Sequence, residues 1–163
     1  MTTSTVDQPP SLEVLVQRAY ASLRNCILTR KHELGQRAGA LALNALLTPS
    51  DDASRQQATT MKYEMLGLDI AMDRLDGEWR HRESPEKFVK AVRSTLVSNR
   101  DYYQQDAGQY ALRVVDSDPV GATYAEGHTN AMRSYQAYVA HKYLLEQLEE
   151  CFADVSKALA ALG

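Results

Sequence analysis

Glu78 and His81 are three residues apart in a segment with helical periodicity, the spacing at which di-iron helical bundles bind a metal from one helix face. Such a site needs a second Glu-x-x-His pair and two further glutamates on the facing helices. Residues 123–162 contain no Glu-x-x-His, and Glu78 falls in the last turn of its expected helix. We therefore interpret this pair as a solvated helix end.

Two rows of carboxylates form a second candidate site. Mg²⁺ is usually held by one or two carboxylates together with substrate phosphates, and helices that face each other across a cavity can supply them. Two arginines interrupt the aspartate row, which favours a solvated, salt-bridged face. An enzyme with a metal- or phosphate-handling acidic site inside the bundle is one alternative function. The carboxylates concerned are Asp69, Asp73, Asp76, Glu146, Glu149 and Glu150.

His141 falls on an expected apolar seam, where a buried imidazole needs partners for both nitrogens. An antiparallel pairing of the first and last helices puts His32 roughly level with His141. The turn between the third and fourth helices likewise puts Asp106 level with His128. We interpret these residues as a polar core layer that fixes the register of the bundle, with a catalytic or pH-sensing pair of His32 and His141 as the alternative. The predicted layer is His32, Asn99, Asp106, His128 and His141.

Tyrosines gather in the second half of the chain. Tyrosine buries a large ring and keeps a polar tip, so it is favoured at protein–protein interfaces. One narrow helical seam cannot take all of these rings, so we expect some to face a partner; ordinary packing at the edge of the core is the alternative. The interface candidates are Tyr102, Tyr103, Tyr110, Tyr135, Tyr138 and Tyr143.

Basic residues form a positive flank on the first expected helix. They suggest a third function, a helical protein that contacts nucleic-acid phosphates. The net charge of −3 and the pI near 5.8 make nucleic acid an unlikely partner, and no base-reading module accompanies the flank. The residues concerned are Arg18, Arg24, Arg30, Lys31, Arg37, Arg55 and Lys62.

The segment 58–79 shows most clearly which elements must position these side chains. Its apolar residues recur at gaps of three and four, which indicates one narrow seam on an α-helix that packs at a shallow angle. A strand would require alternation by two. Such a helix cannot bury its seam alone, so other helices must face it. The seam residues are Ala58, Met61, Met65, Leu68, Met72, Leu75 and Trp79.

Proline-marked breaks divide the chain into four long helices. The pattern predicts an all-α fold, an elongated antiparallel four-helix bundle with up-down-up-down topology and short turns. We expect an extended N-terminal arm at residues 1–10 and a single bundle domain at residues 11–163. The hairpins may equally open and pair with another copy of the chain. The expected helices are residues 11–47, helix two to about residue 82, residues 85–115 and residues 123–162.

Small residues dominate the second half of the first helix. Glycine within a helix lowers its stability by roughly 1 kcal/mol, so Gly35 and Gly39 suggest that another backbone comes close, a kinked segment being the alternative. Cys26 and Cys151 lack the spacing of a zinc site or a disulfide framework. We expect both to be reduced and semi-buried, although antiparallel pairing brings them to nearly the same level.

A helical rod without a catalytic motif favours the function of a non-enzymatic structural or interaction subunit. It would present amphipathic helices to itself or to a larger assembly, such as a phage or virus particle or a secretion machine. The sequence has no Gly-rich phosphate loop or nucleophile elbow, and we expect no cofactor. No apolar run reaches a membrane span and the N-terminus lacks signal-peptide features, so we expect a cytoplasmic protein, or a virion component made in the host cytoplasm.

Overall fold

The computed structural model describes residues 9–162 of the 163-residue chain, and in this part every regular element is a helix. The fold is an all-α helical bundle, which confirms the predicted class. Residues 1–8 of the predicted N-terminal arm lie outside the described residues. The elements are α1 (Leu12–Leu47), α2 (Asp52–Glu78), the 3-10 helix η1 (Trp79–His81), α3 (Pro85–Val115), α4 (Ala122–Cys151) and α5 (Ala153–Ala160).

Local signals set where the first three long helices begin. Ser11 Oγ accepts a hydrogen bond from the Val14 backbone nitrogen at 3.4 Å, and Asp51 Oδ1 accepts one from Ser54 at 3.0 Å. Each bond satisfies an amide that the first turn of a helix leaves free. α3 begins with Pro85, whose missing N–H is not needed at the first helical position.

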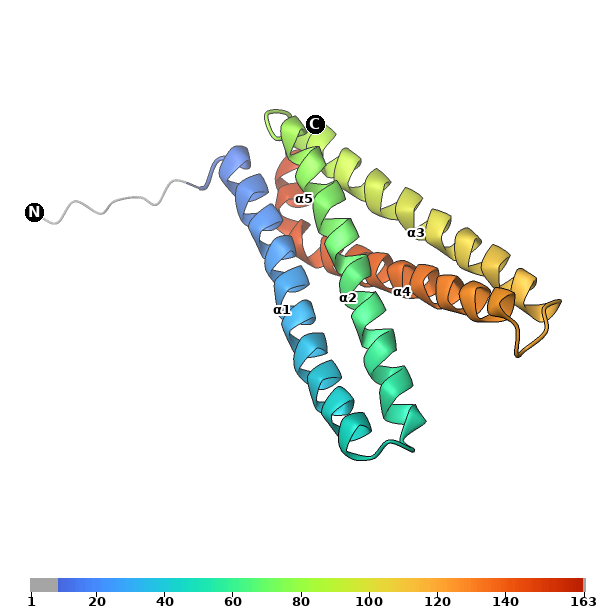
Figure 1. Cartoon of the computed structure of the whole chain (residues 1–163). Helices are drawn as coiled ribbons and strands as arrows, with labels where there is room; N and C mark the ends of the chain where they lie inside the picture. The colour runs from blue at the N-terminus through green and yellow to red at the C-terminus, as the bar shows by residue number, and fades with distance from the viewer. Residues whose placement is uncertain (1–8, 163) are drawn as a thin grey trace, which may run out of the picture.

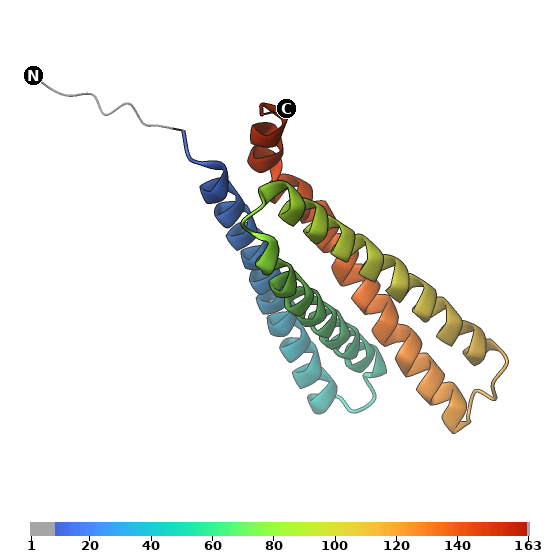
Figure 2. The same cartoon turned by 90° about the horizontal axis from the view of Figure 1, so that it is seen from above.

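The long helices form two antiparallel hairpins, α1–α2 and α3–α4 (Figure 1). The hairpins pack against each other at the end where α2 passes into α3, and they diverge toward their own turns. The same divergence is visible when the molecule is viewed from above (Figure 2). The turn between α1 and α2 is therefore the free end of the first hairpin, with only two helices side by side, and the turn between α3 and α4 is the free end of the second.

The core fills the joined end of the two hairpins. The ring of Trp79 stacks on Tyr20 at a centroid distance of 4.6 Å, and Phe88 packs edge-on against both rings. Edge-on and stacked rings add to the free energy gained from burial. The aliphatic core residues with essentially no exposed surface include Val16, Leu23, Ile27, Leu68, Ala71, Leu75, Val92, Leu96, Ala140, Leu144 and Leu148.

The two hairpins come closest where α2 crosses α4. A Cβ atom added to Gly67 would lie 2.7 Å from the Ala137 Cα and 3.0 Å from the Ala140 Cβ. Only glycine on α2, facing alanines on α4, allows the backbones to approach this closely. Gly35 and Gly39 do not have the predicted role, because a Cβ there would meet only the end of the Met65 side chain or nothing within 4 Å.

The fourth predicted helix is interrupted. α4 ends at Cys151, Phe152 adopts a non-helical backbone conformation (φ −101°, ψ 10°), and α5 continues the chain. Phe152 is buried against Phe88, with ring centroids 6.2 Å apart. The expectation of one helix over residues 123–162 was therefore wrong, because burial of this ring at the joined end accompanies a change of direction that helical periodicity does not reveal.

Candidate functional site

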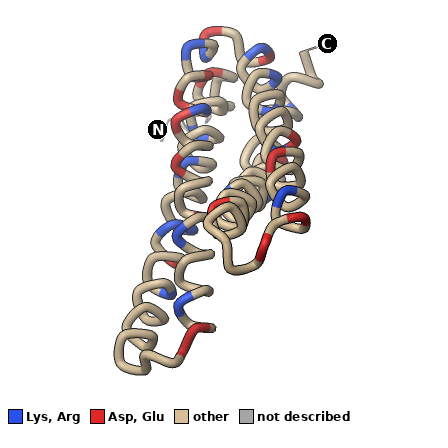
Figure 3. The backbone as a smooth tube through the Cα atoms, turned by 45° about the vertical axis from the view of Figure 1, so that its right-hand side comes forward, with Lys and Arg blue, Asp and Glu red and all other residues tan. Residues whose placement is uncertain are grey.

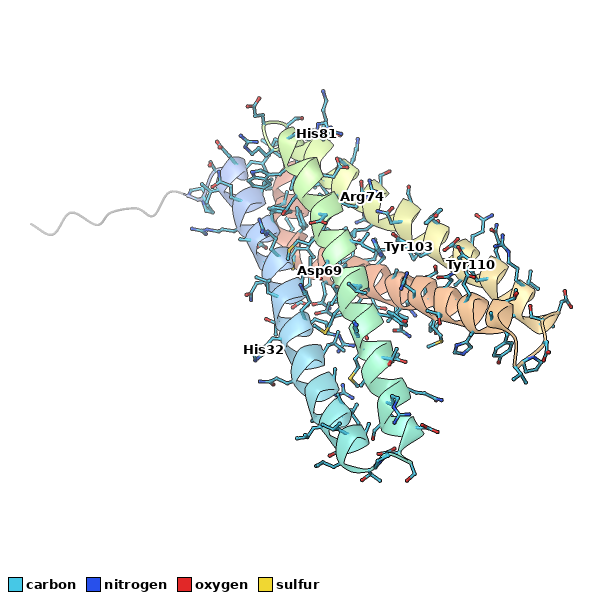
Figure 4. All side chains as sticks on the ribbon, viewed as in Figure 1. His32, Asp69, Arg74, His81, Tyr103 and Tyr110 are labelled. Carbon is cyan, nitrogen blue, oxygen red and sulfur yellow. The ribbon has the colours of Figure 1, made fainter. Side chains whose placement is uncertain are left out.

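The aspartates of α2 and the basic flank of α1 pair with each other. Arg24 Nη1 lies 3.4 Å from Asp76 Oδ1, and Lys31 forms an ion pair with Asp69, which lies between α1 and α2 in Figure 4. The Tyr20 hydroxyl donates a hydrogen bond to Asp76, and burial together with this carboxylate raises the pKa of Tyr20. These contacts tie α1 to α2, so Asp69 and Asp76 are engaged within the chain.

Arg30 connects three helices at the base of the first hairpin. Its Nε and Nη2 atoms donate hydrogen bonds to Glu64 Oε1 at 3.0 and 2.8 Å, which ties α1 to α2. The same guanidinium lies over the ring of Tyr143 on α4, with 5.6 Å between Cζ and the ring centroid. The Glu64 side chain is only 9% exposed, so Arg30 neutralises a carboxylate that water barely reaches.

The carboxylates considered from the sequence do not assemble into one site. Glu149 forms an ion pair with Arg93 of α3 at 2.5 Å. Glu78 Oε1 accepts a hydrogen bond from Thr95 Oγ1 at 2.9 Å, while its Oε2 lies 3.7 Å from His81 Nε2 at the end of α2. Within residues 9–162 no group of three or more His, Cys, Asp or Glu side chains is placed to hold a metal ion.

His141 is fully buried at the joined end of the hairpins. Its Nδ1 lies 2.8 Å from the Ala137 carbonyl oxygen, which can only accept, so Nδ1 carries the proton. Nε2 is then an acceptor, and within residues 9–162 it has no hydrogen-bond partner. The ring lies 5.3 Å from that of Tyr103. Burial lowers the pKa of His141, and the hydrogen bond to Ala137 opposes only part of that shift.

The other members of the predicted polar layer do not surround His141. His32 is exposed on the outer side of α1 and contacts Gln36, because a residue two positions before the buried Leu34 points about 200° away from it (Figure 4). Asn99 is half-buried and lines a small pocket between α2 and α3. The polar layer was therefore wrong for His32, and among the described residues neither His32 nor Asn99 forms a hydrogen bond with His141.

The prediction that Asp106 lies level with His128 is also wrong. The residue opposite Asp106 is Ser134, whose hydroxyl donates a hydrogen bond to Asp106 Oδ2 at 2.5 Å. His128 is exposed and stacks on Tyr124. The turn at residues 116–121 shifts the register, so that residues further along α4 lie opposite α3.

Acidification is expected to destabilise the fold through His141. The pKa of His141 is lowered in the folded state, so below the ordinary value of about 6.5 the unfolded chain binds more protons. Below that value the free energy of unfolding should decrease as the pH is lowered, by at most about 1.4 kcal/mol per pH unit. Urea titrations from pH 7.5 to 4.5 measure this slope. His141→Leu should flatten it and His32→Gln should not; equal slopes in all three proteins would contradict the assignment.

The predicted tyrosine surface is divided among separate places. Tyr103 and Tyr143 are half-buried, against His141 and Arg30 respectively, and burial raises the pKa of each hydroxyl. Tyr110 lies beside Arg113 of its own helix (Figure 4). Tyr102 and Tyr135 are the exposed members; Tyr102 packs on Tyr103, and Tyr135 packs on Tyr138.

The free end of the first hairpin contains a groove that the sequence interpretation missed. The groove runs between α1 and α2, has a volume of about 620 Å³, and is mostly apolar apart from Arg55 and Lys62. The sequence signal that could have identified this groove is the absence of charged residues from residues 38–50. The part of α1 within this stretch is therefore tan in Figure 3. We call it the hairpin groove; its lining is Gly35, Ala38, Gly39, Ala42, Ala45, Leu46, Arg55, Ala58, Thr59, Lys62 and Met65.

Large apolar side chains are exposed at the free end of α1. Leu43, Leu46 and Leu47 are 55%, 75% and 73% exposed. They lie in consecutive turns, whereas a monomeric protein usually exposes such side chains singly. Leu46 lines the hairpin groove, so the free end combines an apolar groove with exposed leucines on the same stretch of α1.

Comparisons with protein-family models, with curated protein sequences and with solved structures found no match for this chain. Its function is therefore inferred from its own surfaces. No helix in the described part of the chain is both long and apolar enough to cross a membrane.

Proposed function

We propose that this protein is a non-enzymatic structural subunit that self-associates through the free end of its first hairpin. The carrying observation is the hairpin groove, a mostly apolar channel of about 620 Å³ whose α1 side belongs to a charge-free stretch that also exposes Leu43, Leu46 and Leu47. An assembled homo-oligomer buries this surface.

A second copy of the same hairpin suits the groove because two antiparallel helices are half of a four-helix bundle. Two hairpins related by a two-fold axis supply four helices, and each copy then offers the same surface to the other. The free end from Leu34 to Leu47 is about 20 Å long, so it presents several turns for packing. Gly39 has nothing within 4 Å of its added Cβ, which leaves room for a helix to approach closely.

The energetics favour association by the leucines rather than by charges. Full burial of one leucine side chain contributes about 1.5–3 kcal/mol, so three of them supply the core of a small interface. Arg55 and Lys62 stand at the border of the groove, where long side chains keep their charges in water and cover apolar surface with their stems.

Light scattering of the full chain over a range of concentrations tests the proposal. We expect wild type to dimerise or oligomerise, and Leu46→Glu and Gly39→Leu to shift the equilibrium at least about tenfold toward monomer. Leu46 is 75% exposed and a Cβ added to Gly39 meets none of the described atoms within 4 Å, so neither change disturbs the core of the monomer. Leu112→Glu is the matched control, because Leu112 is 70% exposed on the second hairpin.

A wild-type protein that stays monomeric up to about 0.5 mM, a concentration far above the dissociation constant of a specific interface, would overturn the proposal. So would an oligomer that persists unchanged in both groove variants, since its interface would then lie elsewhere.

A further inference from the structure

Cys26 and Cys151 face each other where α1 meets the end of α4. Cys26 Sγ donates a hydrogen bond to Gln147 Oε1 at 3.8 Å, and Cys151 Sγ donates one to Ser22 Oγ at 3.6 Å. Ser22 precedes Cys26 by one helical turn, and Gln147 precedes Cys151 by one turn. Each thiol therefore contacts the residue one turn before the other thiol, so the two cysteines lie within about one turn of each other at the contact between α1 and α4.

Both thiols are free and partly accessible. Burial raises the pKa of the Cys26 thiol, and the neighbouring sulfur of Cys151 raises it further, an effect that acts only at short range. Cys26 is thus mostly protonated at neutral pH.

We propose that Cys26 and Cys151 are a site of reversible disulfide formation that links the first hairpin to the second. The oxidant is a low-molecular-weight disulfide. The thiolate of one cysteine attacks one sulfur of the oxidant, which forms a mixed disulfide and releases one thiolate. The thiolate of the other cysteine then attacks the protein sulfur of this mixed disulfide, which closes the protein disulfide and releases the second thiolate. Each cysteine loses one proton, and two electrons pass to the oxidant.

The bond would join residues that are far apart in the sequence. It would close a loop from residue 26 to residue 151 and restrict the unfolded chain, which raises the midpoint of thermal unfolding by roughly 10 °C. α1 and α4 already touch at this level, so the native fold keeps the two cysteines near each other. This inference concerns the joined end and does not depend on self-association through the hairpin groove.

The experiment treats the native full chain with mixtures of reduced and oxidised glutathione, blocks the remaining thiols, and measures the intact mass. We expect a monomeric product about 2 Da lighter than the reduced chain, with no thiol left to block and a raised midpoint of thermal unfolding. Cys26→Ser and Cys151→Ser are the matched controls, and each should stop at a mixed disulfide with glutathione. Wild type unfolded in urea should need at least about tenfold more oxidised glutathione to close the bond.

Three results would overturn the proposal. The first is uptake of glutathione on both cysteines of the native chain without closure of the bond. The second is formation of intermolecular disulfides at low protein concentration. The third is closure at the same concentration of oxidised glutathione in the native and urea-unfolded chains, which would mean that the fold does not bring the sulfurs together.

Discussion

Gly67→Ala is expected to lower the free energy of unfolding by about 1–3 kcal/mol, because the added methyl group has no space. Its Cβ would lie 2.7 Å from the Ala137 Cα and 3.2 Å from the Gln136 carbonyl oxygen. Both are backbone atoms of α4, so no side-chain rotation relieves the overlap. The two hairpins must separate or tilt, and the core around their crossing must loosen with them. Urea denaturation monitored by circular dichroism measures the loss.

Gly77→Ala is the matched control for Gly67→Ala. Gly77 lies in the same helix, yet a Cβ there meets nothing within 4 Å. Alanine has the higher helix propensity, so this change should raise the free energy of unfolding by about 0.5–1 kcal/mol. Opposite signs for the two substitutions are the expected result. Two stabilising substitutions would show that α2 and α4 do not cross at Gly67.

Arg30→Met is expected to have the largest effect of any single charge removal in the first hairpin, a loss of about 3–5 kcal/mol in the free energy of unfolding. The loss arises because Glu64 would remain at a position where its side chain is 9% exposed, without the two hydrogen bonds that it now accepts. The contact of Arg30 with the Tyr143 ring would also be lost.

A second substitution separates the unpaired charge from the packing. Arg30→Met combined with Glu64→Met replaces both members of the pair by apolar side chains, and most of the lost free energy should return. Lys31→Met is the matched control, because its partner Asp69 has a side chain that is 48% exposed; this change should cost less than about 1 kcal/mol. Equal losses for Arg30→Met and Lys31→Met would contradict the role given to burial.

The helices were predictable because their signals are local. Ser11 caps α1, Pro85 begins α3, and three- and four-residue spacing identifies the buried Leu68 and Leu75 of α2. Each of these features depends on the residues of one or two elements.

The arrangement of the hairpins was not predictable in the same way. It depends on the close approach of Gly67 to Ala137, and an amphipathic pattern does not say which glycine meets another backbone. The partners of the charged residues were not predictable for a related reason. The sequence favours a salt-bridged face on α2, but it does not say that Asp76 and Asp69 pair with Arg24 and Lys31 of α1.

Because the hairpins diverge from the crossing at Gly67, a rotation of α2 about this point displaces the free end of the first hairpin. Between this residue and the start of α2 at Asp52 the helix is about 24 Å long, so a rotation of about 10° at the crossing would move the free end by about 4 Å. A change of one methyl group at Gly67 or at Ala140 would thus displace surfaces that lie far from the crossing. In a two-fold dimer joined at the free ends, that displacement would occur in both copies and would change the angle between them.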